Sequence, residues 1–213
     1  MLLFWDRFWQ RVKRAYFKRV FLQYIGSREK SLNVKDRVHI YMPRAVKGKK
    51  LVTIGKNVFL YPGVLFDGSG PITIGDNVFI GKDVILYASE GGGITIGSDV
   101  SIAAQTYIID CDHGMALTGV PNAKQTPAVA PVVIGSDVWI AANCTILKGS
   151  TVGDGAVLGA KTLVRGSIPA NAVAVGIPAR VVKYRTAGEE KEQAAEKAPA
   201  ETAGNMEEKD GTV

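Results

Sequence analysis

The chain has 213 residues, 46% of them hydrophobic, and this length and composition fit one domain plus a tail. No apolar run approaches the roughly 20 residues that span a bilayer, and charged residues such as Asp6, Arg7 and Arg11 interrupt the N-terminus, which argues against a transmembrane helix or a signal peptide. Two cysteines, Cys111 and Cys144, are too few for a disulfide scaffold and lack zinc-ligand spacing, so we expect reduced thiols in a cytoplasmic protein.

The formal net charge of +6 is unevenly distributed along the chain. The first thirty residues are mostly basic, whereas the last stretch is acidic, so the two ends should have different partners. The sequence pI is near 9.3, but the basic residues carry neither a helix-turn-helix pattern nor a stacking-aromatic motif. Nucleic acid is therefore not an expected partner.

Residues 1–30 predict a basic amphipathic helix. Apolar side chains recur at helical spacing: Trp5, Trp9, Val12, Tyr16 and Val20. Basic side chains fall together on another side: Arg7, Arg11, Arg14 and Lys18. Two interpretations stay open, either peripheral contact of residues 1–25 with the anionic inner face of a membrane, or packing of the apolar stripe on the protein body or a neighbouring subunit.

Residues 31–185 contain an internal repeat with a period of six, an aliphatic residue followed by a small, two polar and a small or β-branched residue. The aliphatic heads are Ile54, Ile74, Ile80 and Ile96, and then Ile134, Ile140, Ile146, Val152, Leu158 and Val164 in one unbroken phase. Period six fits neither a helix nor a long strand, so each unit should be a short strand plus a turn. Three units should close one triangular coil of an all-β parallel β-helix, with the heads inside and Gly, Asn or Asp at turns of positive φ.

The coil should begin near Val38 and end near Val175. Residues 110–131 interrupt it without an aliphatic hexad and should leave the body as a loop, where chemistry tends to reside. Residues 176–183 read as a turn and a short closing segment. The acidic tail, residues 186–213, has almost no large apolar residue and is expected to be disordered.

Three segments carry a resemblance to a known family: Ile-Gly-Ser-Asp-Val-Trp-Ile-Ala-Ala at 134–142, Gly-Asp-Gly-Ala-Val-Leu-Gly-Ala at 153–160 and Gly-Ile-Pro-Ala-Arg at 176–180. They resemble the hexapeptide-repeat acyltransferases, within them the galactoside, maltose and capsule or O-antigen O-acetyltransferases. The resemblance covers residues 54–183 and implies a left-handed coil, a homotrimer and active sites shared between two subunits. It also implies acetyl-CoA as co-substrate.

The candidate general base is His113, one of only two histidines and the one in the loop. It matches the position of the family's catalytic histidine, upstream of the Val-Trp-Ile repeat, which implies that it takes the proton of an acceptor hydroxyl. Asp110 and Asp112 are both candidates to orient it, or to cap a turn instead. His39 is expected at the surface, and Cys144 in the core.

The resemblance also implies the coenzyme positions, in a groove that small residues keep open. Those matching the family are Ala142, Ala160, Arg165, Gly166, Arg180 and Lys183. The last two cations would lie near phosphates. Trp139 would either flank the pantetheine arm or fill a corner of the coil. No metal ligand set is expected, and a zinc carbonic anhydrase on this fold would need three histidines where the chain has two.

The acceptor is expected to be a sugar or a lipid-linked saccharide of a surface polysaccharide, such as O-antigen, capsule or exopolysaccharide. It would be contacted by the variable segments 87–93 and 115–131. N-acetylation of an amino sugar nucleotide is an alternative, although the nucleotide-binding domain common in that branch is missing, and serine acetyltransferase lacks support because its helical domain is absent. A non-catalytic β-helix scaffold is the alternative from another class.

Overall fold

The computed structural model describes residues 49–186 without a break. Before residue 49 it describes residues 22–25, 33–34 and 38–42, and nine positions between 5 and 19. The predicted acidic tail therefore lies outside the described residues except for its first residue.

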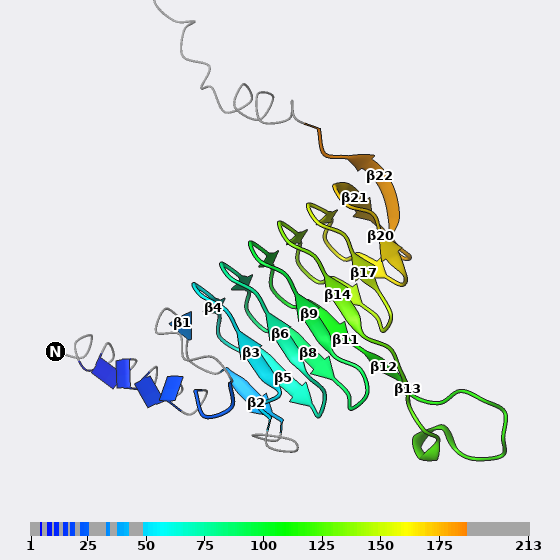
Figure 1. Ribbon diagram of the computed structural model, residues 1–213, viewed down its shortest axis with the longest axis horizontal. Coiled ribbons are helices and arrows are strands. Elements are labelled where there is room, and N and C mark those ends of the chain that lie inside the picture. The colour runs from blue at the N-terminus through cyan, green and yellow to red at the C-terminus, as the bar shows by residue number, and fades with distance from the viewer. Residues whose placement is uncertain are drawn as a thin grey trace, which may run out of the picture.

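Between residues 33 and 184 the described chain winds as a parallel solenoid of three large sheets (Figure 1). Sheet A consists of β3 (Val52–Ile54), β6 (Ile72–Ile74), β9 (Ile94–Ile96), β14 (Val132–Ile134), β17 (Thr151–Val152) and β20 (Ser167–Ile168). Sheet B consists of β1 (Asn33–Val34), β4 (Phe59–Leu60), β7 (Phe79–Ile80), β10 (Ser101–Ile102), β15 (Trp139–Ile140), β18 (Val157–Leu158), β21 (Ala172–Val175) and β22 (Arg180–Tyr184). Sheet C consists of β2 (His39–Tyr41), β5 (Leu65–Gly68), β8 (Ile85–Ala88), β11 (Tyr107–Ile109), β16 (Thr145–Ile146) and β19 (Leu163–Val164). From β3 to β21 each coil adds one strand to A, then B, then C, which confirms the predicted three-sided coil.

The aliphatic heads form buried columns inside this coil. In sheet A, Ile54 pairs with Ile74, Ile74 with Ile96, and Ile96 with Ile134, each at most 2% exposed. The β-branched residue four positions after a head, such as Val58 after Ile54, is also buried. Strands of two to four residues thus bury one side chain in two, because successive side chains of a strand point to opposite faces.

The corners between sheets A and B carry the turn residues that the repeat predicts. Asn57, Asn77, Asp99 and Asp137 occupy equivalent turns with φ of 53°, 57°, 60° and 55°. Asn and Asp tolerate this left-handed conformation better than other residues with a Cβ. Their side chains also link coils, since the Asn57 Nδ2 donates to Asn77 Oδ1 at 3.1 Å and the Asn77 Nδ2 to Asp99 Oδ1 at 2.9 Å.

The outer faces of sheets A and C differ in chemistry. The outward column of sheet A is mostly threonine, as in Thr53, Thr73 and Thr95. The column of sheet C reads, strand by strand, Leu65, Ile85, Tyr107, Thr145 and Leu163, all of them half-buried. The sheet C face is therefore the more apolar of the two.

The N-terminal helix is only partly described. The described positions between 5 and 19 are all helical, but no α-helix can be given bounds within the described residues, so the amphipathic helix over residues 1–30 stays a prediction. No helix of the described chain combines the length and apolarity needed to cross a membrane. The left-handed sense of the coil and the domain boundaries also stay predictions.

Cys144 is a core residue, 1% exposed, as its place in the repeat predicts. Its thiol donates to the Gly159 carbonyl oxygen at 3.2 Å, and burial raises its pKa. A thiol reagent at mildly alkaline pH should therefore modify Cys111, which is half-buried, in the native protein, and Cys144 only after denaturant is added. Native Cys111→Ser protein should not react; rapid reaction of that variant would contradict the buried position of Cys144.

Candidate active site

The loop that carries His113 leaves the solenoid at a corner between sheets C and A. After β11 the chain forms β12 (Cys111–Asp112), which pairs antiparallel with β13 (Ala128–Val129) (Figure 1). His113 directly follows β12, so this two-stranded ribbon holds it close to the solenoid wall. The chain between β12 and β13 leaves the solenoid here, and the bounds 110–131 of the loop stay a prediction.

The loop is closed on itself by one glutamine. Gln125, next to the short 3-10 helix η1 (Asn122–Lys124), accepts from the Ala116 amide at 3.1 Å and donates to the Ala116 and Val120 carbonyls at 3.0 and 2.7 Å. A Cβ on Gly114 would lie 2.5 Å from the Cβ of Gln125, so residue 114 must be glycine for the two to pack this closely. These contacts define the chain directly after the histidine.

Asp110 anchors the base of the loop in the preceding coil. It is fully buried, and its carboxylate accepts the Ser89 amide at 2.9 Å and the Gly93 amide at 2.6 Å. Ionised carboxylates make strong hydrogen bonds with such backbone donors. The geometry matches the turn-capping role that the sequence left open for this aspartate.

Asp112 lies on the open side, where its Oδ2 is 3.5 Å from the Nζ of Lys148 in the next coil. Asp112 and His113 line the same pocket, whereas Asp110 does not. Within the described part of the chain no hydrogen bond joins His113 to either aspartate. Asp112 is thus the better placed candidate to orient the imidazole.

The pocket around His113 has a volume of about 650 Å³. Its wall includes Tyr87, Tyr107, Cys111 and Met115. Burial raises the pKa of both tyrosines, and the negative charge of a Cys111 thiolate would raise both further. Their phenols are therefore protonated at neutral pH and can donate hydrogen bonds to a ligand in the pocket. The period-six pattern places Tyr107 on the outer face of its coil, but nothing in the sequence marks it as facing the loop.

The predicted coenzyme residues Ala142 and Ala160 lie at the opposite edge of sheet C. Both follow a sheet B strand and precede a sheet C strand, and they stack, since the Lys161 amide donates to the Ala142 carbonyl at 2.9 Å. Arg165 and Gly166 lie instead at the C-to-A corner, after β19. Within one chain, the width of sheet C therefore lies between these alanines and His113.

Trp139 and Lys183 lie together on the outer face of sheet B. They line a groove of about 620 Å³ with Asp137 and Arg185 among its other residues. Trp139 is 55% exposed, and Lys183 pairs with Val173 in the register of β22 against β21. Arg180 begins β22, is exposed and donates to the carbonyl of Ala179.

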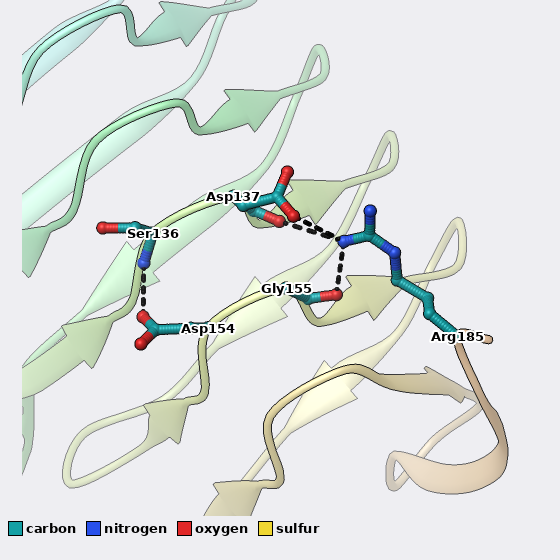
Figure 2. Close-up of polar contacts among 5 residues, drawn as sticks. All are labelled: Ser136, Asp137, Asp154, Gly155 and Arg185. Carbon is teal, nitrogen blue, oxygen red and sulfur yellow. Dashed lines mark hydrogen bonds and ion pairs between the residues drawn. The ribbon is translucent and has the colours of Figure 1, made fainter. Parts of the chain in front are cut away.

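Arg185 is a residue that the sequence analysis missed. Figure 2 shows its guanidinium over the turn that contains Asp137: Nη1 lies 2.8 Å from Asp137 Oδ2 and 2.8 Å from the Gly155 carbonyl oxygen. That turn is held from the next coil by Asp154, whose Oδ1 accepts the Ser136 amide at 2.7 Å. Arg185 thus ties the end of β22 to a fixed corner of the solenoid.

Loss of the Arg185 contacts with Asp137 and Gly155 should make β22 open more often. Arg185→Ala loses an ion pair that is partly exposed and a hydrogen bond to a backbone carbonyl, so we expect a loss of roughly 1 kcal/mol in unfolding free energy. Amide hydrogen exchange across residues 180–184 should become faster. Lys82→Ala is the matched control, because among the described residues Lys82 forms an ion pair only with its neighbour Asp83. Unchanged exchange in Arg185→Ala would contradict the proposed role of Arg185.

Sequence comparison gives two family matches. The bacterial transferase hexapeptide family (six repeats) matches residues 131–166, and the hexapeptide repeat of succinyl-transferase matches residues 71–109. A putative lipopolysaccharide biosynthesis O-acetyl transferase, WbbJ of Escherichia coli K12, is 35% identical over 151 residues, 68% of this chain and 77% of that protein. The chain belongs to the hexapeptide-repeat transferases.

Two solved structures share the fold of this hexapeptide-repeat transferase. The Vibrio cholerae hexapeptide-repeat acetyltransferase VCA0836, complexed with acetyl-CoA, is 25% identical with a TM-score of 0.53, over 79% of this chain and 77% of that one. The Bacillus cereus N-acyltransferase AntD has a TM-score of 0.68 at 22% identity, over 84% and 94% of the two chains. At this identity, the likeness to AntD concerns the fold alone. In the described residues no group of three or more His, Cys, Asp or Glu side chains could hold a metal ion.

Proposed function

We propose that this chain transfers an acetyl group from acetyl-CoA to a sugar hydroxyl during the synthesis of a surface polysaccharide. The observation that carries the proposal is His113, held by the β12–β13 ribbon at a pocket large enough for a sugar ring. The name of WbbJ supports an O-acetyl transfer in lipopolysaccharide synthesis, and the acetyl-CoA complex of VCA0836 supports the donor.

In this reaction His113 acts as general base. Its neutral imidazole accepts the proton of the acceptor hydroxyl while that oxygen attacks the thioester carbonyl carbon. The C–S bond then breaks, and the imidazolium returns the proton to the leaving coenzyme A thiolate. Asp112, which lines the same pocket, orients the ring, while Asp110 holds the base of the loop in place.

Acetyl-CoA would bind along the edge of sheet C that carries Ala142 and Ala160. Small side chains there let an extended pantetheine arm approach the backbone. The Trp139 and Lys183 groove, together with Arg180, supplies an aromatic surface and cations for the nucleotide end. Arg165 and Gly166 lie across sheet C from this edge, so we propose that they contact the coenzyme bound to a neighbouring copy of the chain.

A complete site requires a second copy of the chain. The alanine edge and the His113 loop lie at opposite edges of sheet C, so packing of copies through this sheet would place the alanines of one against the loop of the next. The half-buried, largely apolar column of sheet C, from Leu65 to Leu163, suits such packing. We therefore propose a homotrimer with three shared sites.

The coenzyme and the base can be tested separately. His113→Ala should retain acetyl-CoA binding in calorimetry but lower kcat by about 10²- to 10⁴-fold. Arg180→Ala should weaken acetyl-CoA binding about tenfold, because it removes a charge-assisted hydrogen bond. Cys111→Ser is the control and should keep most activity; its inactivation would point to an acetylated thiol instead of direct transfer. Wild-type protein that binds no acetyl-CoA would contradict the enzyme and favour a scaffold.

The two tyrosines of the pocket should bind the acceptor. Their rings can stack on the apolar face of a sugar, and their protonated hydroxyls can bond to its oxygens. With an acceptor found by screening, Tyr87→Phe should raise KM for the acceptor roughly tenfold and leave KM for acetyl-CoA unchanged. Tyr41→Phe, an exposed tyrosine of β2, is the control. An equal rise in both KM values would contradict this assignment.

The same acceptor screen separates O- from N-transfer. It should include amino sugar nucleotides beside hydroxyl sugars, because AntD has the same fold and is an N-acyltransferase. Faster turnover of an amino sugar nucleotide than of any hydroxyl sugar would overturn the O-acetyl assignment and leave the coenzyme site intact.

A further inference from the structure

The described part of the N-terminal segment carries an aromatic face that is partly exposed. The described positions Trp5, Phe8, Trp9, Val12 and Tyr16 are helical and between 41% and 64% exposed. Apart from the adjacent Phe8 and Trp9, neighbours in this set are three or four residues apart, the spacing that places side chains on one face of a helix. In Figure 1 this segment lies at the end of the solenoid formed by β1 and β2, opposite to β22.

Three of these side chains, Trp5, Phe8 and Trp9, pack against one another. The ring centroids of Trp5 and Phe8 are 6.0 Å apart, and those of Phe8 and Trp9 are 5.8 Å apart, both in edge-to-face geometry. Contact of these rings with water is unfavourable, because Trp and Phe each expose a large apolar area, so burial of the surface against a partner would release free energy. We call these five residues, Trp5 to Tyr16, the aromatic face.

Basic side chains flank the aromatic face. Arg11 and Arg19 are helical and exposed, and Lys18 is helical and half-buried. In the sequence, residues 1–25 carry six basic residues against one acidic residue: Arg7, Arg11, Lys13, Arg14, Lys18 and Arg19 against Asp6. An apolar face rich in Trp bordered by Lys and Arg is the pattern of helices that lie in the plane of a membrane surface.

We propose that the aromatic face docks on an anionic lipid surface. Tryptophan and tyrosine favour the headgroup level of a bilayer, where the ring is in an apolar layer and the polar atom stays hydrated. The flanking cations are attracted by anionic headgroups. A second copy of the chain fits this segment less well, because two copies packed through it would bring their clustered basic residues together.

Docking by this segment does not depend on the proposed acetyl transfer. If both hold, the membrane would concentrate the enzyme beside saccharide acceptors that carry a lipid. The two can be tested apart, because vesicle binding needs neither acetyl-CoA nor an acceptor.

The experiment uses full-length protein and vesicles of phosphatidylglycerol mixed with phosphatidylcholine. The chain has three tryptophans, so Trp139→Phe leaves Trp5 and Trp9 as the reporters. Their fluorescence should shift to the blue on adding anionic vesicles, and the protein should sediment with them. Pure phosphatidylcholine vesicles should give weaker binding, and added salt should reduce binding to the anionic ones.

Two variants and one control test which residues dock. Arg11→Glu with Arg19→Glu should lower vesicle partitioning by at least about fivefold for each charge removed. The double variant Trp5→Ala, Trp9→Ala keeps Trp139 and is assayed by sedimentation. It should lower vesicle partitioning at least as much. Lys56→Glu with Lys82→Glu changes two exposed lysines of the solenoid turns and should leave partitioning nearly unchanged.

Three results would overturn the proposal. Wild-type protein that stays in the supernatant with anionic vesicles would do so, as would partitioning that falls equally in the lysine control. A smaller oligomeric mass of the Trp5→Ala, Trp9→Ala protein in light scattering, without vesicle binding by the wild type, would assign the aromatic face to a second copy of the chain.

Discussion

The stacking of aliphatic residues from coil to coil is the constraint on which the rest of this structure depends. Each strand is too short to bury a core alone. Ile54 is buried because it stacks on Ile74 of the next coil, and Ile74 because it stacks on Ile96. This requirement fixes the parallel register, and the register in turn fixes which side chains reach each outer face. The threonine column of sheet A, the apolar column of sheet C and the groove beside Trp139 all follow from it.

The candidate active-site residues lie where this regular stacking is interrupted. The chain leaves the solenoid after Asp110 and rejoins it at β14. Asp110 is buried there, and its hydrogen bond with the Gly93 amide fixes the point of departure. The second interruption is the C-terminal reversal, where β22 runs antiparallel to β21 and carries Lys183 onto the face of sheet B. Rigid coils therefore hold both candidate halves of the site, which is the arrangement that precise positioning of reacting groups needs.

The sequence predicted the parts that repeat, and it could not predict contacts between parts that do not. Period six was enough to place the aliphatic heads, the buried Cys144 and the loop after residue 110. The Arg185 contact with Asp137 joins residues 48 apart, so it depends on how many coils lie between them and on the path of β22. Likewise, Asp110 and Asp112 look alike in the sequence, and only the fold buries Asp110 fully and leaves Asp112 half-buried beside Lys148.

The column of polar side chains at the corners between sheets A and B distinguishes one alignment of the coils from the others. A solenoid of near-identical coils could shift by a whole coil during folding and still stack aliphatic residue on aliphatic residue. Along this column, however, two amides, Asn57 and Asn77, are followed by two carboxylates, Asp99 and Asp137, and then by the guanidinium of Arg185. A slip by one coil would separate Arg185 from Asp137 and break the amide-to-carboxylate bond, so polar side chains select one alignment among several that the hydrophobic core accepts equally well.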